Sequence, residues 1–292
     1  MSEQSSSGPG QNGQRDGRIV LAGTPIGNIG DASPRLAELL QTADVVAAED
    51  TRRLHKLLQA LGISAGGRVI SYHEHNEVAR TAELLELVRG GATLVLVTDA
   101  GMPAVSDPGF RLVEAAVAEE LPVTAVPGPS AVLTALALSG LPTDRFTFEG
   151  FLPRKAGERS ARLAELAGER RTMVFFEAPH RLEAMLRAVD AGFGPDRRAA
   201  VCRELTKLHE EVLRGPVRQL LQWAESNQVR GEIAVVVAGA AEAAPERAED
   251  HVAAVNDLVA QGSRVKDAVA AVAADARVSK RELYAAVLAA RG

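Results

Sequence analysis

The sequence predicts an α/β protein, and three observations lead to this class. Short apolar runs rich in β-branched residues alternate with longer helical patterns, which is typical of parallel strands covered by helices on both faces. The alternation fills two consecutive blocks, so we expect two α/β domains with a cleft between them as the default binding site. Three more helical patterns follow an Ala- and Glu-rich segment and predict a small C-terminal helical bundle.

The N-terminal α/β domain is expected over residues 18–128. Each helical pattern in it stands between two strand patterns, so consecutive strands are expected to run parallel. The strands are predicted at RIVLAG, DVVAA, RVIS, ATLVLVT and PVTAV, and the helices at LAELLQ, TRRLHKLLQAL, VARTAELLELVRG and FRLVEAAVAEE.

The C-terminal α/β domain is expected over residues 129–240. PGPS at 127–130 opens a helical run that ends at Gly140, the usual position of a C-cap glycine. Helical patterns separate the strands predicted after it, which are RFTFEG, TMVFFE, RAAVCR and GEIAVVVAG.

The two ends of the chain have a different composition. Residues 1–17 have no apolar residue after Met1, so they cannot repay the entropy of ordering, and we predict a disordered tail. Residues 241–248 are interpreted as a linker, and residues 249–292 as a three-helix domain whose last helix begins with Ser279 and Glu282 in capping-box spacing. This domain is interpreted as a helix-turn-helix module or, equally, a dimerisation bundle.

Composition excludes several classes of protein. The chain has 292 residues, 46% of them hydrophobic and 24% charged, which is ordinary for a globular protein. No apolar run approaches the roughly 18 residues of a membrane helix, and no secretory signal precedes the first strand, so we expect a soluble, cytoplasmic protein without membrane contact. The single cysteine, Cys202, excludes an internal disulfide and a Cys-based zinc cluster and is interpreted as buried.

Two glycine-containing loops follow strands of the first domain. GTPIGN at 23–28 matches neither the dinucleotide fingerprint nor the P-loop, but its glycines predict bare backbone brought against a ligand; a simple turn is the alternative. The second loop, DAGMPAVSDPG, follows the strongest strand pattern. Its residues Asp99, Ala100, Gly101 and Met102 are expected on the same rim, because ligands of open α/β sheets sit beyond the carboxyl ends of strands. Asp99 could hold a cationic or hydroxylated ligand group, or merely cap a turn.

Two polar clusters lie in the same domain. In AAEDTRR, Glu49 and Asp50 could accept protons or hydrogen bonds and Arg52 could grip a phosphate, or the charges could simply suit a helix dipole. In SYHEHNE, His73 and His75 are expected on one face of an extended segment, which would permit a metal site. Since no third ligand stands nearby, polar contact with a substrate is favoured.

The second domain has two comparable clusters and the main excess of basic residues. FFEAPHR places Glu177 at a strand end, with Pro179 in the first turn of a helix beside His180 and Arg181. CRELTKLHEE is expected to place Arg203, Glu204 and Lys207 where a strand becomes a helix, which would suit a phosphate.

The net charge determines how the protein could bind a nucleic acid. Because it is −5, we expect a nucleic acid to be bound only by a local basic patch. Solvated helix faces are the alternative for the basic residues of this region, which are Arg154, Lys155, Arg159, Arg162, Arg170, Arg171, Arg197 and Arg198.

The motifs together resemble one family. GTPIGN, AAEDTR, HEHN, SDPG, PGPSA, LPTDRFTFEGFLPR, PHR and CRELTKLHEE, in this order and spacing, resemble the ribosomal RNA small subunit methyltransferase I family of the tetrapyrrole methylase superfamily. The resemblance covers about residues 18–240, and the C-terminal segment resembles the helix-turn-helix appendix of that family. Met102 departs from the pattern, in which Thr is usual. The resemblance implies two domains of the tetrapyrrole methylase type, a homodimer, and a methyl group transferred from S-adenosylmethionine to the ribose 2′-hydroxyl of cytidine 1402 in 16S rRNA.

The resemblance also implies roles for residues, with 16S rRNA in the small ribosomal subunit as partner and no metal. A tetrapyrrole (corrinoid or uroporphyrinogen) methyltransferase and a non-catalytic ribosome-assembly factor are the alternatives. The candidate general bases are His73, Glu177, Glu49 and Asp50. The candidate cofactor residues are Thr24, Pro25, Asp99, Ala100, Gly101, Met102, Ser130, Ala131, Phe176, Val201 and Ile233. The candidate substrate residues are Arg52, His75, Asn76, Arg154, Lys155, His180, Arg181, Arg203, Glu204 and Lys207.

Overall fold

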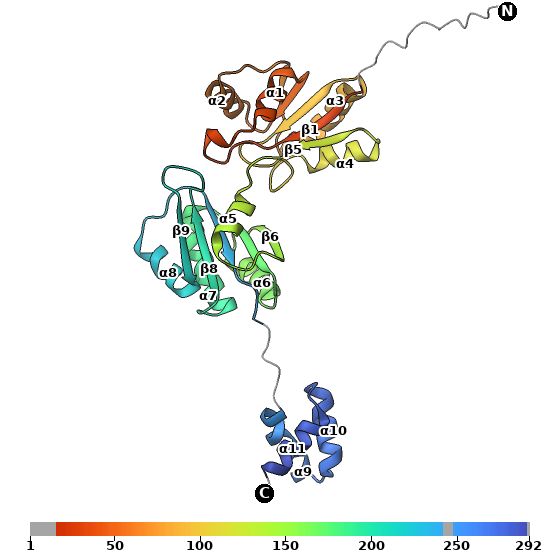
Figure 1. The fold of residues 1–292 in the computed structure, drawn as a ribbon, viewed down its shortest axis with the longest axis vertical. Coiled ribbons are helices and arrows are strands. Elements are labelled where there is room, and N and C mark those ends of the chain that lie inside the picture. Colours follow the sequence, from red (N-terminus) through yellow and green to blue (C-terminus); the bar gives the residue numbers. More distant parts are fainter. Residues whose placement is uncertain (1–15, 242–247, 291–292) are drawn as a thin grey trace, which may run out of the picture. The chain divides into compact units, whose positions relative to one another are not determined.

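The computed structural model describes residues 16–241 and 248–290 (Figure 1). These residues form two compact units, one ending at Ala240 and the other beginning at Ala241. Nearly all of the predicted disordered tail at 1–17 lies outside the described residues, as does most of the predicted linker at 241–248.

The N-terminal half of the first unit is built on a five-stranded sheet with every strand parallel to its neighbours, in the order β3-β2-β4-β1-β5. All five strands coincide with predicted runs, which confirms the parallel α/β prediction. The strands are β1 (Arg18–Ala22), β2 (Val45–Ala48), β3 (Arg68–Ser71), β4 (Thr93–Val97) and β5 (Val123–Val126).

Helices cover both faces of this sheet because side chains alternate between its faces. Val20 and Val46 point to the face covered by α1 and α2, and Ile19 and Ala47 point to the face covered by α3 and α4 (Figure 1). The helices are α1 (Pro34–Thr42), α2 (Thr51–Leu61), α3 (Glu77–Arg89) and α4 (Phe110–Ala118), with the short 3-10 helix η1 (Ile29–Asp31) before α1.

The C-terminal half of this unit has a mixed sheet in the order β6-β7-β10-β8-β9, in which only β6 and β7 are parallel. One face packs against α5, and the other packs against α6, α7 and α8. The strands are β6 (Phe146–Phe151), β7 (Thr172–Glu177), β8 (Arg198–Arg203), β9 (Glu211–Pro216) and β10 (Ile233–Val237). The helices are α5 (Ala131–Ser139), η2 (Pro179–Arg181), α6 (Ala156–Leu166), α7 (Leu182–Phe193) and α8 (Val217–Ser226).

Helix α5 follows the sequence prediction, whereas the helix expected after β8 was wrong. The Ser130 hydroxyl accepts a hydrogen bond from the Leu133 N–H at the start of α5, and Gly140 ends it with a left-handed φ of 71°. After β8 the chain turns back into β9 as an antiparallel hairpin. Glu204 and Thr206 have φ values of 51° and 65° in the connecting loop, which a helix does not allow.

The second unit consists of η3 (Ala248–His251), α9 (Val252–Ala260), α10 (Val265–Asp275) and α11 (Lys280–Ala289) around its own apolar core. The Ser279 hydroxyl accepts a hydrogen bond from the Glu282 N–H, as expected for the start of α11. Within the described part of the chain, no helix is long and apolar enough to cross a membrane.

Candidate functional site

The two glycine-containing loops lie together at the carboxyl edge of the first sheet. The Thr24 N–H donates to the Gly101 carbonyl at 2.9 Å and the Gly101 N–H donates to the Thr24 carbonyl at 3.1 Å. The Thr24 hydroxyl donates to the Thr98 carbonyl at 3.2 Å. The prediction that GTPIGN and the loop after β4 share one rim is therefore confirmed.

The glycines of GTPIGN contact other loops of the protein. A Cβ on Gly23 would lie 2.7 Å from both Gly128 Cα and Met102 Sδ, and a Cβ on Gly27 would lie 2.5 Å from Lys207 Cγ. That the backbone of GTPIGN also contacts a ligand stays a prediction, but these two glycines have a packing role. They allow the loop to pack closely against its neighbours.

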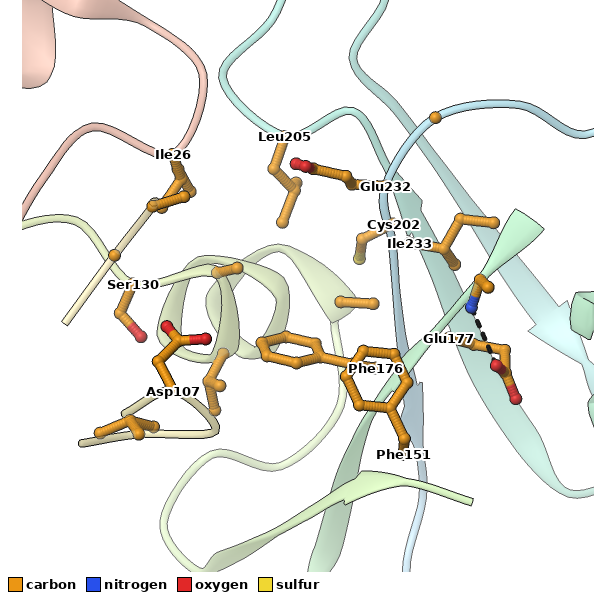
Figure 2. Close-up of a pocket in the computed structure, with 18 of the residues that line it drawn as sticks. Ile26, Asp107, Ser130, Phe151, Phe176, Glu177, Cys202, Leu205, Glu232 and Ile233 are labelled. Atoms are coloured by element: carbon orange, nitrogen blue, oxygen red, sulfur yellow. Dashed lines mark hydrogen bonds between the residues drawn. The ribbon is translucent and has the colours of Figure 1, made fainter. Parts of the chain in front are cut away.

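A cavity of about 410 Å³ opens beside these loops and is lined from both halves of the unit (Figure 2). Its volume lies within the roughly 300–1,000 Å³ that is typical of small-molecule sites. The lining is mainly apolar. It consists of Ile26, Ala100, Gly101, Met102, Val105, Asp107, Ser130, Ala131, Val132, Phe151, Phe176, Glu177, Ala178, Pro179, Cys202, Leu205, Gly231, Glu232, Ile233 and Ala234.

Seven of the candidate cofactor residues line this cavity: Ala100, Gly101, Met102, Ser130, Ala131, Phe176 and Ile233. Thr24, Pro25 and Asp99 line a neighbouring cavity of about 60 Å³ instead.

Val201 is placed differently from the expectation, in the core under the opposite face of the C-terminal sheet. Since successive residues of a strand alternate, its neighbour Cys202 is the residue that lines the cavity. The thiol of Cys202 is buried, as predicted, and burial raises its pKa to about 11.

The smaller cavity is acidic. The Asp99 N–H donates to Glu49 Oε2 at 3.1 Å, and Arg53 Nε lies 3.3 Å from Asp99 Oδ2. Burial raises the pKa of both carboxyls. The negative charges of Asp99 and Asp50 raise the pKa of Glu49 further, whereas the positive charge of Arg53 lowers the pKa of both Glu49 and Asp99. Both carboxyls therefore hold protons more strongly than free side chains.

Asp107 is a carboxylate of the cavity lining that the sequence motifs did not single out, although the quoted SDPG motif contains it. In Figure 2 its carboxylate points toward Ser130, and both residues line the main cavity. Burial, followed by the nearby charges of Glu49 and Asp99, raises its pKa to about 6. A Pro- and Gly-containing turn on the ligand rim was the signal that could have found it.

Glu177 lines the same cavity, where one of its carboxylate oxygens is engaged and the other, Oε2, is buried without a hydrogen-bond partner. Its Oε1 accepts the Ala178 N–H at 2.8 Å and lies 3.2 Å from Arg181 Nε. In Figure 2 the carboxylate points away from Ser130, whereas the Phe176 ring points toward it. Burial raises the pKa of Glu177, and Arg181 opposes that effect.

The other two candidate bases have local structural roles. The Asp50 carboxylate caps α2 by accepting the Arg52 N–H and pairs with the Arg52 side chain at 2.7 Å, which holds the Asp50 pKa far below its usual value. His73 begins a turn in which its N–H donates to Asn76 Oδ1 at 2.8 Å, so the expected extended segment is wrong. The rings of His73 and His75 still lie 6.0 Å apart, and His73 Nδ1 is buried without a hydrogen-bond partner.

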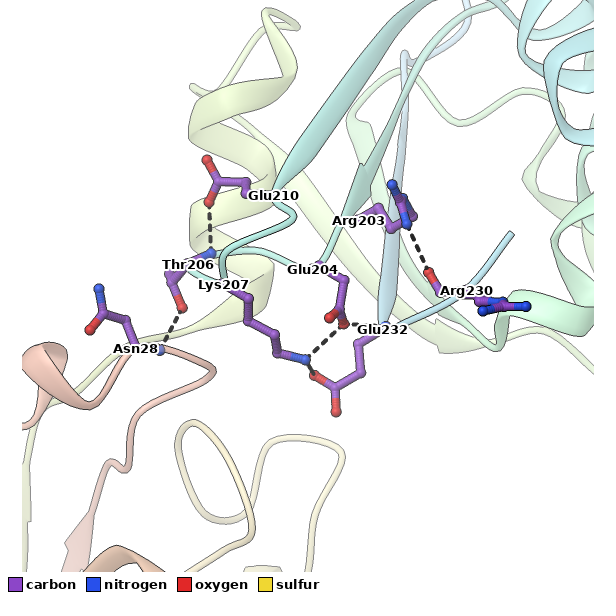
Figure 3. Close-up of polar contacts among 8 residues, drawn as sticks. All are labelled: Asn28, Arg203, Glu204, Thr206, Lys207, Glu210, Arg230 and Glu232. Atoms are coloured by element: carbon purple, nitrogen blue, oxygen red, sulfur yellow. Dashed lines mark hydrogen bonds and ion pairs between the residues drawn. The ribbon is translucent and has the colours of Figure 1, made fainter. Parts of the chain in front are cut away.

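The candidate phosphate residues of the β8–β9 hairpin form an internal network (Figure 3). Lys207 Nζ lies 2.8 Å from Glu204 Oε1 and 2.9 Å from Glu232 Oε2. Arg203 pairs with Glu211 at 3.0 Å. The Thr206 hydroxyl accepts the Asn28 N–H at 3.1 Å and thereby joins this hairpin to GTPIGN. Lys207 and Arg203 are therefore already neutralised by carboxylates, and their ion pairs stabilise the hairpin beside the main cavity.

The remaining candidate substrate residues differ in availability. Arg181 donates to the Leu152 carbonyl at 2.6 Å, and Asn76 Nδ2 donates to the Ser71 carbonyl, so both support the fold. Arg154, His75 and His180 are exposed, and exposed Lys155 pairs with Glu158.

Several of the basic residues expected to form a local patch are also held internally. Arg162 pairs with Glu149 and Glu165, Arg171 pairs with Glu169, and Arg197 donates to the Ala238 and Ala167 carbonyls.

Comparisons with known proteins agree on one group. Residues 18–221 match the family of Tetrapyrrole (Corrin/Porphyrin) Methylases. Proteins named Ribosomal RNA small subunit methyltransferase I are 55% identical in Mycobacterium tuberculosis H37Rv, over 94% of this chain and 96% of the relative, and 43% identical in Synechocystis sp., over 92% and 96%.

Solved structures share the fold at low identity. The methyltransferase CobJ is 20% identical with a TM-score of 0.58, covering 78% of this chain and 96% of its own. Uroporphyrin-III C-methyl transferase from Thermus thermophilus, solved in complex with S-adenyl homocysteine, is 20% identical with a TM-score of 0.54, covering 76% and 97%.

Proposed function

The chain belongs to the tetrapyrrole (corrin/porphyrin) methylase family and, within it, to the ribosomal RNA small subunit methyltransferase I group, and from this premise we propose that it methylates the ribose 2′-hydroxyl of cytidine 1402 in 16S rRNA. It is an rRNA methyltransferase that uses S-adenosylmethionine. The specific nucleotide and the 2′-oxygen rest on the resemblance of the motifs.

The observation that carries this proposal is the cavity of about 410 Å³ between the two halves of the first unit. Its mostly apolar lining and the loop residues Gly101 and Ser130 fit a donor with a flat apolar base and a polar tail. The Thr24–Gly101 hydrogen bonds hold its N-terminal edge. Residues that would hold the donor are Ala100, Gly101, Met102, Ser130, Ala131, Phe176 and Ile233.

The donor supplies a methyl group that its sulfonium already activates. The task left to the protein is to hold the ribose oxygen in line with that methyl group, and positioning of this kind supplies roughly 7–11 kcal/mol. A ribose hydroxyl is a weak nucleophile while protonated, so a nearby base adds about 10²- to 10⁴-fold. The target cytidine must leave its stack to reach the cavity.

The assembly and location of the enzyme are part of the proposal. We propose a homodimer, as the family resemblance implies, acting in the cytoplasm on the small ribosomal subunit. Sedimentation equilibrium of the full-length protein tests the dimer, and a monomer mass at micromolar concentration would contradict it.

The experiment that tests the function is methylation of small ribosomal subunits that lack the modification. The full-length protein and labelled S-adenosylmethionine are incubated with these subunits, with naked 16S rRNA, or with uroporphyrinogen, and rRNA fragments are mapped by mass. We expect one ribose-methylated cytidine. Methylation of the tetrapyrrole alone would favour the alternative activity, and binding without transfer to any substrate would favour an assembly factor.

A further inference from the structure

We propose that Asp107 accepts the proton of the ribose 2′-hydroxyl during methyl transfer, an inference that rests on the proposed function. Asp107 comes from the loop between β4 and α4 and lines the main cavity, as Ser130 does, and its carboxylate points toward Ser130 in Figure 2. The residue assigned here lies outside the four candidate bases that the motifs suggested.

The other proton acceptors of the main cavity are engaged or unsuitable. Glu177 Oε1 is held by the Ala178 N–H and Arg181, Oε2 is buried without a hydrogen-bond partner, and the carboxylate points away from Ser130. The Glu232 carboxylate is paired with Lys207 at 2.9 Å. The Cys202 thiol has a pKa of about 11, so it stays neutral near pH 7.

Asp107 has the opposite surroundings. Among the described residues it has no salt-bridge partner, and its charged neighbours Glu49 and Asp99 are also acidic. Burial and these charges raise its pKa to about 6, so the carboxylate is ionised at pH 7 and still takes up a proton readily. A general base is most effective when its pKa lies near the working pH.

The position of Asp107 also gives the proton a route out. Asp107 lines a second, more polar groove of about 360 Å³, so its carboxylate stands between the main cavity and this groove. The groups that act on it from the strand-end side are the charged Glu49 and Asp99, which raise its pKa, and the Thr98 hydroxyl, which lowers it. The charged residues that line the groove with it are Glu74, Glu77, Arg111 and Glu114. Water in the groove can therefore receive the proton after each turnover.

The step balances without another reactant. The 2′-oxygen forms a bond to the methyl carbon while the bond between that carbon and the sulfur breaks, and the electron pair of the broken bond stays on the sulfur. The proton of the hydroxyl passes to Asp107. The products are the methylated ribose, neutral S-adenosylhomocysteine and protonated Asp107, which loses its proton to water.

The test compares wild type with Asp107→Asn in the full-length protein, using single-turnover methylation of small subunits between pH 5 and pH 8. Wild type should lose activity as the pH falls through about 6, because the base becomes protonated. The methylation rate of Asp107→Asn should be about 10²- to 10⁴-fold lower than that of wild type, and it should not fall further as the pH is lowered through 6. Asp144→Asn makes the same chemical change in an exposed loop outside the cavity and should match wild type.

Two further measurements do not depend on turnover. The affinity for S-adenosylmethionine, measured by calorimetry, should be unchanged in Asp107→Asn. Carbon-13 spectra of labelled Asp side chains should show one carboxyl that titrates near pH 6 in wild type and is missing from the variant.

Three results would overturn the assignment. They are a variant within threefold of wild type, a loss of donor affinity equal to the loss of rate, and a wild-type rate that is flat from pH 5 to pH 8. The last applies even if Asp107→Asn fails to fold. A wild type that methylates no rRNA would instead refute the proposed function.

Discussion

The two halves of the first unit contribute different groups to the walls of the same cavity. The N-terminal half contributes Asp107, with Glu49 and Asp99 behind it, whereas the C-terminal half contributes the rings of Phe151 and Phe176 and two carboxylates, those of Glu177 and Glu232, that are paired with cations. The acidic groups stand at the carboxyl ends of parallel strands, where loops converge and burial is partial. The comparison teaches that one half suits the apolar body of a ligand and the other half suits the movement of a proton.

The largest effect is expected on the stability of the protein, from a substitution that disturbs the packing of the loops in the N-terminal half. In Gly23→Ala the new methyl group would meet Gly128 Cα and Met102 Sδ at 2.7 Å, so the loops must separate. Overpacking of this kind costs about 1–3 kcal/mol of unfolding free energy, which urea denaturation measures. As a control, Gly157→Ala in α6 meets no atom within 4 Å and should be neutral or slightly stabilising. Equal losses in both variants would refute the close-packing explanation.

The next effect sharpens the role of the apolar wall. Phe176→Ala should weaken S-adenosylmethionine binding about tenfold, equivalent to about 1.4 kcal/mol, because the ring lines the cavity. Isothermal calorimetry measures this change. Phe146→Ala on β6 removes an exposed ring outside the lining and should leave affinity unaltered. Comparable losses in the two variants would show that the effect is not local.

A smaller effect should appear in stability. The folded pKa of Asp107, about 6, lies above its unfolded value near 3.9, so the folded protein binds the proton more tightly and its stability falls as pH rises from about 4 to 6. Asp107→Asn removes this dependence. The variant should therefore gain about 1 kcal/mol relative to wild type at pH 7.5 compared with pH 4, a value reduced because the side chain is partly exposed. Thermal unfolding at the two pH values measures this, and a constant difference would contradict it.

The smallest effect tests the coupling between carboxylates. Glu49→Gln removes a negative charge that raises the pKa of Asp107, so that pKa should fall toward its ordinary value. The low-pH limb of the methylation rate should then move to lower pH. Glu38→Gln on the outer surface of α1 removes the same charge at a distance and serves as the matched control. An unmoved limb in Glu49→Gln would show that the two groups are not coupled.

Much of the fold could be predicted because local patterns and long-range packing agree in it. Apolar runs such as those at 93–97 and 233–237 are buried strands, and Gly140 ends α5 as its position indicated. The β8–β9 hairpin escaped prediction because Glu204 and Thr206 adopt left-handed conformations in residue types that rarely signal them. Contacts with distant segments hold the chain there, namely the ion pair between Lys207 and Glu232 and the hydrogen bond from the Asn28 N–H to the Thr206 hydroxyl.

The site was only partly predictable for a related reason. Both loops follow the carboxyl ends of parallel strands, and this indicated that Thr24 and Gly101 lie on the same rim. The direction of a side chain could not be predicted in this way, because it depends on which face of the strand the residue occupies and on the groups that it contacts. Glu177 shares a strand with Phe176 and faces the other way, and Asp50 is occupied by its own helix. Burial, followed by the charges of Glu49 and Asp99 from other segments of the chain, raises the pKa of Asp107.

The contact between Gly23 and Gly128 limits how this chain can vary. Where two backbones touch with no side chain between them, neither position can accept a larger residue unless the other segment shifts as well. A library that randomises both codons should therefore return glycine at each, while the neighbouring surface positions drift freely. Gly23 and Gly128, which have no side chain, would then be among the most constrained positions of the chain.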